Sequence, residues 1–382
     1  MRAAAAAQRS VSGAVPGAVC CARLGQHSDR IAGAVHISRP RSGWRWVQSA
    51  IVVPMNADRL LIPAIDPVLT SELNHVIPGA GRLPAAAQGN GLIRLRRGLR
   101  FPDGEWAALT PTERYRAFVA GVTQTFKKRP VLSHYSAAAL WGLPIIGPWP
   151  REVHILVPHA SGGRSDPGIR RHAIGVPEAD VVDIDGFLVT SIARTVLDLA
   201  TTAPMLTAIA AADAALWVPR GRGALPLVAK SEIWQLWSTR EFRGKRRAQE
   251  LIQFADTGAE SPLESASRVN IALAGFPQPV LQHRIEVDGR EYWGDFYWPG
   301  ADAWGEVDGL VKYVDPNDSD GVAAAEAVYR EKLREDAVRR RVTRFARWDR
   351  GIAMSRTRLR RRLIELGLEP RNHEPRHLRW PL

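Results

Sequence analysis

Cysteine and long apolar runs are both scarce in this chain. Its 382 residues hold two cysteines, Cys20 and Cys21, and adjacent cysteines have a poor geometry for a disulfide. The remainder has none, which excludes a disulfide framework and a cysteine-based zinc site and fits a reducing cytoplasm. No stretch approaches ~18 consecutive apolar residues, so we expect no transmembrane helix. The composition therefore favours a cytoplasmic protein.

Acidic residues are also outnumbered. The chain carries 39 Asp and Glu against 52 Lys and Arg, for a formal net charge of +13. A basic balance favours polyanions, because each neutralised phosphate releases counterions. An arginine-rich composition drawn from a GC-rich genome explains the charge equally well. The charge is thus compatible with DNA as a partner without establishing it.

The first 54 residues contain a single acid, Asp29, among many Ala, Arg, Ser and Gly residues. This composition is similar to that of a transit peptide, but it lacks a clear apolar segment for secretion. Ordinary patterning begins at Met55. We interpret residues 1–54 as disordered or as the product of a wrongly assigned start, with Met55 as the true first residue.

Helix and strand signals alternate from residue 110 onward. Thr110-Pro-Thr-Glu113 has the form of a capping box with proline at the first helical position, which predicts a helix to about Lys128. Further helices are predicted at 133–142, 191–200 and 205–217, and strands at 153–158, 169–174 and 187–190. We therefore expect a mixed α/β region over residues 55–220, followed by linker helices over 221–257.

Three segments of this region carry a resemblance to a known family. They are Ser133-His-Tyr-Ser-Ala-Ala-Ala-Leu-Trp-Gly-Leu-Pro144, Val189-Thr-Ser-Ile-Ala-Arg-Thr-Val-Leu-Asp-Leu-Ala200 and Ala212-Asp-Ala-Ala-Leu216. Together they resemble the AbiEi-type antitoxin-like proteins of actinobacteria. The resemblance implies a DNA-binding or toxin–antitoxin context, although the helix-turn-helix that begins such proteins is poorly matched here.

The pattern changes after residue 258. Ser261, Pro262 and Glu264 begin a helix that ends at Gly275. Alternating residues predict strands at 280–287, 291–298 and 303–308, with a hairpin turn at Asp288-Gly289. A helix near 322–341 and a strand at 342–348 follow. The predicted order, α-β-β-β-α-β over residues 258–350, is that of an α+β domain.

Acidic residues give this second region its chemistry. Glu306 and Asp308 are two residues apart in a strand, so both point to one face. If the neighbouring strand pairs with theirs, Asp295 joins them, and three carboxylates repel one another unless a cation intervenes. Oxygen ligands favour Mg²⁺ or Mn²⁺, which lower the pKa of an attacking water. We expect Glu264 to assist this metal site and Lys312 to stabilise developing charge.

The segments Ser261-Pro-Leu-Glu264, Asp295, Glu306-Val-Asp-Gly309 and Lys312-Tyr313 resemble the PD-(D/E)xK nuclease superfamily, and most closely its branch similar to very-short-patch-repair endonucleases. The resemblance implies a restriction-endonuclease-like fold, a Mg²⁺ cofactor and hydrolysis of phosphodiesters in DNA. The position of the usual lysine holds Asp308, so the predicted metal site is better supported than the catalysis.

Basic residues gather after the predicted domain's last helix. Arg339, Arg340 and Arg341 lie at the end of that helix, and Arg347 lies on the last strand. They are candidates to contact a phosphate backbone, or else belong to a solvated helix face. We expect residues 351–382 to form a basic tail.

Three functions remain open. The first is a metal-dependent DNA endonuclease fused to an antitoxin-like region, with Asp295, Glu306 and Asp308 as metal ligands. The second is a catalytically inactive DNA-binding regulator or antitoxin, which the missing lysine favours. The third is a protein-interaction module with a toxin or antitoxin partner.

Overall fold

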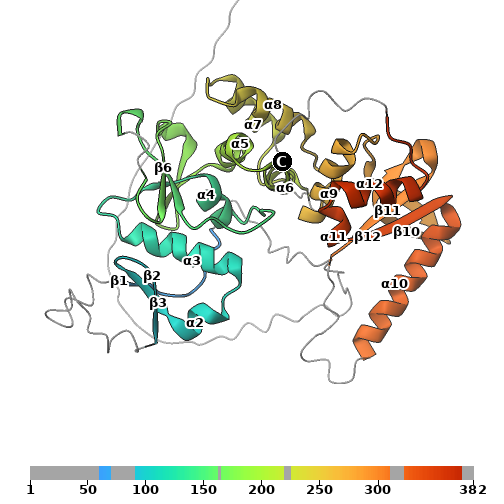
Figure 1. Cartoon of the computed structure of the whole chain (residues 1–382), viewed down its shortest axis with the longest axis horizontal. Helices are drawn as coiled ribbons and strands as arrows, with labels where there is room; N and C mark the ends of the chain where they lie inside the picture. Colours follow the sequence, from blue (N-terminus) through green and yellow to red (C-terminus); the bar gives the residue numbers. More distant parts are fainter. Residues whose placement is uncertain (1–59, 70–90, 162–164, 219–224, 310–321, 372–382) are drawn as a thin grey trace, which may run out of the picture. The chain divides into compact units, whose positions relative to one another are not determined.

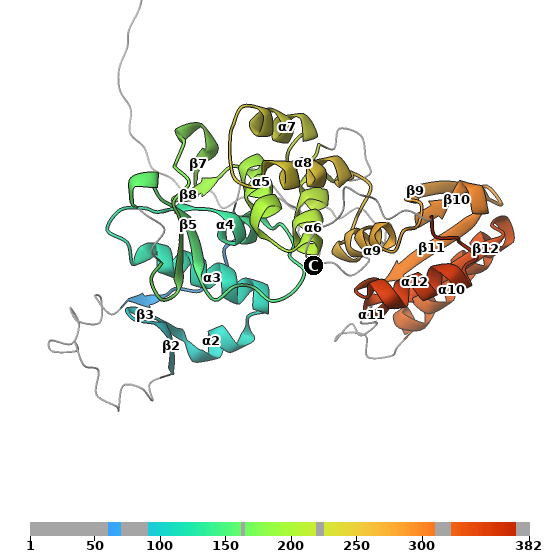
Figure 2. The ribbon, with the colours of Figure 1, turned by 45° about the horizontal axis from the view of Figure 1, so that its top comes forward.

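The computed structural model describes residues 60–69, 91–161, 165–218, 225–309 and 322–371. These residues form mixed α/β structure, as predicted (Figures 1 and 2). The interpretation of residues 1–54 and of Met55 lies outside the described residues. Among the residues that are described, no helix combines the length and apolar character needed to span a bilayer.

The first part of the described structure runs from residue 60 to α9, and it opens with a small three-stranded antiparallel sheet. Its order is β1-β3-β2, and two helices follow it directly in the chain. The capping box at Thr110 is present and begins α3 as predicted. The bounds of these elements are β1 Val68–Leu69, β2 Leu92–Arg96, β3 Leu99–Pro102, α2 Asp103–Ala108 and α3 Pro111–Gln124.

A five-stranded mixed sheet follows, with strands in the order β6-β5-β4-β8-β7. The pairs β5–β6 and β4–β8 are parallel, and β4–β5 and β7–β8 are antiparallel. The bounds are β4 Val131–Leu132, α4 His134–Trp141, β5 Val153–Leu156, β6 Ile169–His172, β7 Val181–Ile184 and β8 Phe187–Thr190. Helix α4 begins after Ser133 and ends at Gly142, whose φ of 79° suits a residue without a Cβ.

Helices complete this part and share its core. They are α5 Ile192–Thr202, α6 Met205–Leu216, α7 Lys230–Ser238, α8 Lys245–Phe254 and α9 Pro262–Leu273. We predicted linker helices over 221–257, and α7 and α8 are helices. They are not a detached linker, however, because Ile233, Leu251 and Ile252 are buried in the same core as α5 and α6.

The second described part has the predicted order of elements. After α9 come β9 Val280–Val287, β10 Arg290–Trp298, β11 Ala303–Asp308, α10 Val322–Arg341 and β12 Arg344–Asp349. The sheet order is β12-β11-β10-β9, with β11 and β12 parallel and the other pairs antiparallel. The alternation read in the sequence therefore predicted the strands and the hairpin correctly.

Two separate apolar clusters cover the two faces of this sheet. On one face, Phe296 and Trp348 pack with residues of α9, α11 Arg350–Ala353 and α12 Arg356–Glu365. On the other face, Trp304 packs with Val338 of α10. We expected a basic tail over 351–382, but residues 351–371 instead form α11 and α12, and their leucines complete the core.

Candidate metal centres

Asp295 lies at an irregularity in the middle of the second sheet. The pairing of β9 with β10 includes Gly294↔His283 and Phe296↔Leu281 but skips Asp295 and Gln282 between them. Gln282 has a φ of 48°, a conformation that strains a residue with a side chain. At this gap in the ladder the Asp295 carboxylate accepts a hydrogen bond from the Val307 N–H at 2.8 Å.

Glu264 comes to the same place from the first turn of α9. Ser261 caps this helix, as predicted, by accepting from the Glu264 N–H. The Glu264 carboxylate accepts from Gln282 Nε2 at 3.1 Å and from the Glu260 N–H at 2.9 Å. Burial raises the pKa of Glu264 to about 7. Burial, and then the charges of Glu264 and Glu306, raise the pKa of Asp295 well above its usual range.

Glu306 has different neighbours. Its two oxygens form ion pairs with Arg334 at 2.8 Å and with Arg347 at 2.6 Å. Burial opposes ionisation, but Arg334 and Arg347 outweigh it and lower the pKa of Glu306. Trp304 Nε1 donates to the same carboxylate at 3.0 Å. Glu306 is therefore a charged carboxylate that two guanidinium groups already neutralise.

Asp308 shares a face with Glu306, as predicted, because both contact Arg347. It is nevertheless half exposed, and burial raises its pKa to about 6 against the attraction of Arg347. The charges that act on Asp295 come from Glu264, Glu306 and Arg334. The structure thus groups Asp295 with Glu306 and Glu264, and it places Asp308 beside Arg347. Lys312 lies outside the described residues.

The arginines predicted to contact phosphate divide into two kinds. Arg347 already interacts with carboxylates, since it forms ion pairs with Glu306 and Glu331 and approaches Asp308. Arg339, Arg340 and Arg341 are exposed at the end of α10. Arg339 pairs with Glu335 and Arg340 with Asp288. Exposed ion pairs exchange readily with other anions, so these three stay candidates for phosphate contact.

One group of ligand-type side chains was not predicted at all. Within the described residues, the three side chains whose ligand atoms all lie within 4.8 Å of one another are His134, His154 and His172. The buried carboxylates do not meet that spacing. A signal existed for His134, which lies in one of the segments quoted above, but the other two histidines are 20 and 38 residues further on. No local pattern joins them.

The segments that carried the first resemblance prove to hold buried ion pairs. Arg194 donates to Asp198 at 2.8 Å and to Asp180 at 2.5 Å, and Arg240 adds a second guanidinium to Asp180. These residues join the turn just before β7, α5 and the segment between α7 and α8. Charges so deeply buried need partners. The spacing of these arginines and aspartates in the sequence is therefore explained first by the packing of the fold.

A similar pair joins α6 to α9. Asp213 accepts from Arg268 at 2.6 Å and from Ser265 at 2.8 Å, and all three side chains are buried. This contact connects the helix that carries Glu264 to the core of the first part. It therefore fixes one of the elements on which the carboxylate site depends.

Two curated relatives match part of the chain. Both are uncharacterized proteins of Mycobacterium tuberculosis, one from strain CDC 1551 / Oshkosh and one from strain H37Rv, and each is 34% identical over 161 residues. The match covers 40% of this chain and 56% of each relative, so it shows similarity over part of both proteins. No protein-family profile matches the chain. No solved structure matches it either.

Proposed function

We propose that the second part of the chain is a Mg²⁺-dependent phosphodiesterase that acts on DNA. The observation that supports this proposal is a group of three buried acids, each at most 4% exposed, in which the charges of Glu264 and Glu306 act on Asp295 and raise its pKa. The order α9-β9-β10-β11-α10-β12 is compatible with the restriction-endonuclease-like fold that the sequence resembles.

The electrostatics give a reason for a cation. Two buried carboxylates with raised pKa values, Glu264 and Asp295, ionise together only at a cost in free energy. A bound divalent cation would offset that cost, and carboxylate oxygens are the donors that Mg²⁺ prefers. Asp295 and Glu306 would hold the ion, and Glu264 and Asp308 would assist. The bound ion would supply Lewis-acid polarisation of a phosphodiester.

The protein's own residues would position the DNA. Arg339, Arg340 and Arg341 form an exposed basic end of α10, the helix that covers the β11 face carrying Trp304. Phosphate contacts of this kind make binding sensitive to salt. An AbiEi-like role for the first part, in a toxin–antitoxin or defence setting, is part of the same proposal.

A second candidate, a DNA-binding protein without turnover, is favoured by one specific observation. Arg334 and Arg347 occupy both oxygens of Glu306, so a cation would have to share that carboxylate with two guanidinium groups. The ion pairs that join Arg334 and Arg347 to Glu306 and Glu331 would then serve to stabilise the fold. In that case the basic surface binds DNA and the acids hold the fold together.

One experiment separates the two candidates. Supercoiled plasmid and single-stranded DNA are incubated with the full chain in Mg²⁺ or Mn²⁺, and nicking is compared among wild type, Asp295→Asn and Glu286→Gln. Glu286 is an exposed acid on β9 and serves as the matched control. The phosphodiesterase requires cleavage by wild type and the control, and a loss of at least about 100-fold in Asp295→Asn.

Cleavage that survives in Asp295→Asn would exclude this site. The absence of cleavage together with salt-dependent DNA binding would support the second candidate. That binding should weaken when Arg340 and Arg341 are replaced by Ala, whereas replacement of the exposed Lys127 and Lys128 should leave it unchanged.

A further inference from the structure

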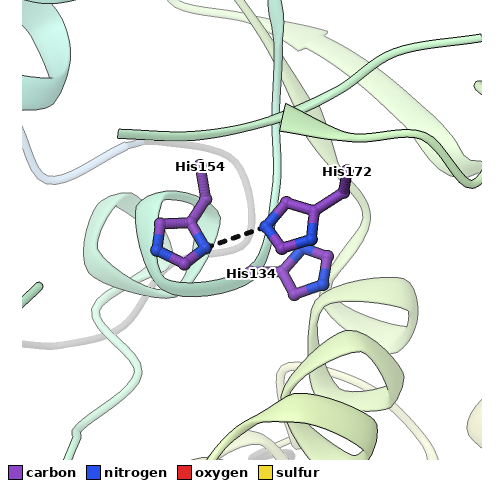
Figure 3. Close-up of side chains that lie close together, drawn as sticks. All are labelled: His134, His154 and His172. Carbon is purple, nitrogen blue, oxygen red and sulfur yellow. Dashed lines mark hydrogen bonds between the residues drawn. The ribbon is translucent and has the colours of Figure 1, made fainter. Parts of the chain in front are cut away.

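Three imidazoles converge in the first part of the chain, remote in sequence from the carboxylate site. His134 is the first residue of α4, His154 lies on β5 and His172 ends β6 (Figure 3). Nδ1 of His154 and Nε2 of His172 are 3.0 Å apart. The ring of His134 stacks on that of His172 with centroids 3.6 Å apart. Each ring offers a ligand nitrogen, and the ligand atoms lie within 4.8 Å of one another.

The fold brings these rings together by strand register and one strained residue. His154 pairs with Arg170 in the parallel β5–β6 ladder, and His172 lies two residues beyond Arg170, so both imidazoles lie on one face. His134 has a φ of 49°, which is unfavourable for a side chain of its size. The Ser133 N–H donates to the His154 carbonyl at 3.0 Å and holds the start of α4 against β5.

Asp198 of α5 adds an anion to the group. Its Oδ1 accepts from Arg194. Its Oδ2 is buried with no hydrogen-bond partner in the described part of the chain, and it lies 3.6 Å from Nδ1 of His134. A buried carboxylate oxygen without a hydrogen bond is costly. A cation in contact with this oxygen removes that cost.

The spacing fits one ion. Zinc–nitrogen bonds of 2.0–2.1 Å in a tetrahedron place neighbouring ligand atoms about 3.3 Å apart. His154 Nδ1 and His172 Nε2 are 3.0 Å apart, and His134 Nδ1 and Asp198 Oδ2 are 3.6 Å apart, so these two separations lie on either side of that value. The three imidazoles thus lie close enough to share one ion, and Asp198, which is adjacent to His134, is the candidate for a fourth ligand.

The protonation states are also suitable. Burial lowers the pKa of His134 to about 3, of His154 to about 2 and of His172 to about 3. The nearby charges of Arg170 and, for His134, Arg194 act in the same direction. All three imidazoles are therefore neutral at pH 7 and keep the lone pairs that a metal needs. Asp198 supplies the negative charge that offsets those arginines.

We propose that His134, His154 and His172 bind one transition-metal ion, best matched by Zn²⁺, with Asp198 as the fourth ligand. Imidazole nitrogen favours Zn²⁺, Co²⁺ and Ni²⁺ over Mg²⁺. Four protein ligands close the coordination shell, which is the arrangement of structural zinc sites. The ion thus joins α4, β5, β6 and α5, and it is independent of the proposed phosphodiesterase.

Cobalt provides a direct test. The full chain, carrying a purification tag without histidine, is freed of metal by a chelator and titrated with Co²⁺, and then with Zn²⁺. Visible absorption from tetrahedral Co²⁺ should saturate at about one ion per chain, and Zn²⁺ should displace it. His172 is partly exposed whereas His134 and His154 are buried, so His172→Gln is the variant chosen. It should weaken Co²⁺ binding by at least about 100-fold.

Two controls make the outcome specific. His159→Gln alters an exposed histidine of the same part of the chain and should bind Co²⁺ like wild type. Asp295→Asn should also bind like wild type, which separates this site from the carboxylate site. Wild-type protein that binds neither Co²⁺ nor Zn²⁺ would overturn the proposal, whatever the variants do. Unchanged binding by a folded His172→Gln protein would overturn it too.

Discussion

The two clusters of ligand-type residues are built from opposite chemistry. The histidine cluster His134, His154 and His172 is neutral at pH 7, because burial lowers the pKa of each imidazole. The acids Glu264 and Asp295 are also buried, but burial raises their pKa values. In both places burial disfavours the charged form. Burial therefore keeps the histidines neutral and ready to bind a metal. It also makes ionisation of the two acids costly in free energy unless a cation or a proton neutralises them.

This difference separates what each site can bind. Neutral nitrogen donors select a transition metal, whereas anionic oxygen donors select Mg²⁺ or Mn²⁺. The carboxylate site also contains two arginines that compete for Glu306, while the histidine cluster has one carboxylate oxygen left without a hydrogen bond. The acids were the easier site to find in the sequence, yet the ligand atoms of the histidines lie closer to one another than those of the acids.

The largest expected effect is at Glu306. Glu306→Gln leaves Arg334 and Arg347 without the carboxylate that neutralises them, and we expect it to lower the free energy of unfolding by about 2–3 kcal/mol. Urea unfolding followed by tryptophan fluorescence measures this change. Glu286→Gln, on the exposed side of β9, should stay within about 0.5 kcal/mol of wild type. An equally small change in Glu306→Gln would show that the arginine network contributes little.

The next effect depends on pH and concerns Glu264. Its pKa rises from 4.5 to about 7 in the folded chain, so the stability it contributes is full below pH 4.5 and is lost as pH rises through 7. Glu264→Gln cannot lose a proton. The variant should therefore gain roughly 2 kcal/mol relative to wild type between pH 5 and pH 8 in the presence of a chelator. A pH-independent difference between the two proteins would contradict this account.

The histidine cluster should respond with the opposite sign. Below pH 6.5 the unfolded chain protonates His172, whereas the folded chain does so only near pH 3, so stability falls as pH decreases from 6.5. His172→Gln lacks this proton uptake and should lose about 1 kcal/mol less than wild type between pH 7 and pH 5. The measurement is urea unfolding of metal-free protein, with His159→Gln as control. Parallel pH profiles for His172→Gln and wild type would count against the buried neutral imidazole.

The smallest effect is a gain. Asp295→Asn keeps an acceptor for the Val307 N–H but removes a buried carboxyl whose ionisation is opposed by burial and by the charges of Glu264 and Glu306. At pH 8 without metal we expect this variant to be more stable than wild type by about 0.5–1 kcal/mol. Thermal unfolding with and without Mg²⁺ gives the comparison. Mg²⁺ should raise the melting temperature of wild type and leave that of Asp295→Asn unchanged; equal shifts in both would separate Asp295 from any Mg²⁺ site.

Much of the fold was predictable because its signals are local. The capping residues Thr110 and Ser261 begin the predicted helices, and the alternation before and after Asp288-Gly289 gives the predicted hairpin. The prediction was less good where burial depends on distant partners. Residues 351–371 look like a basic tail because arginines dominate their composition, yet Leu359 and Leu363 recur on one face of α12 and complete a core.

The sequence by itself determined the order of elements from α9 to β12 and the pairing of Glu306 with Asp308 on one strand face, since each follows from residues a few positions apart. Only the tertiary structure decided which acids meet. Asp295 lies at a gap in the β9–β10 ladder and interacts with Glu264 and Glu306, whereas Asp308 contacts Arg347. The histidine cluster came entirely from the register of β5 with β6 and the packing of α4 and α5, because strand pairing joins residues that no local pattern relates.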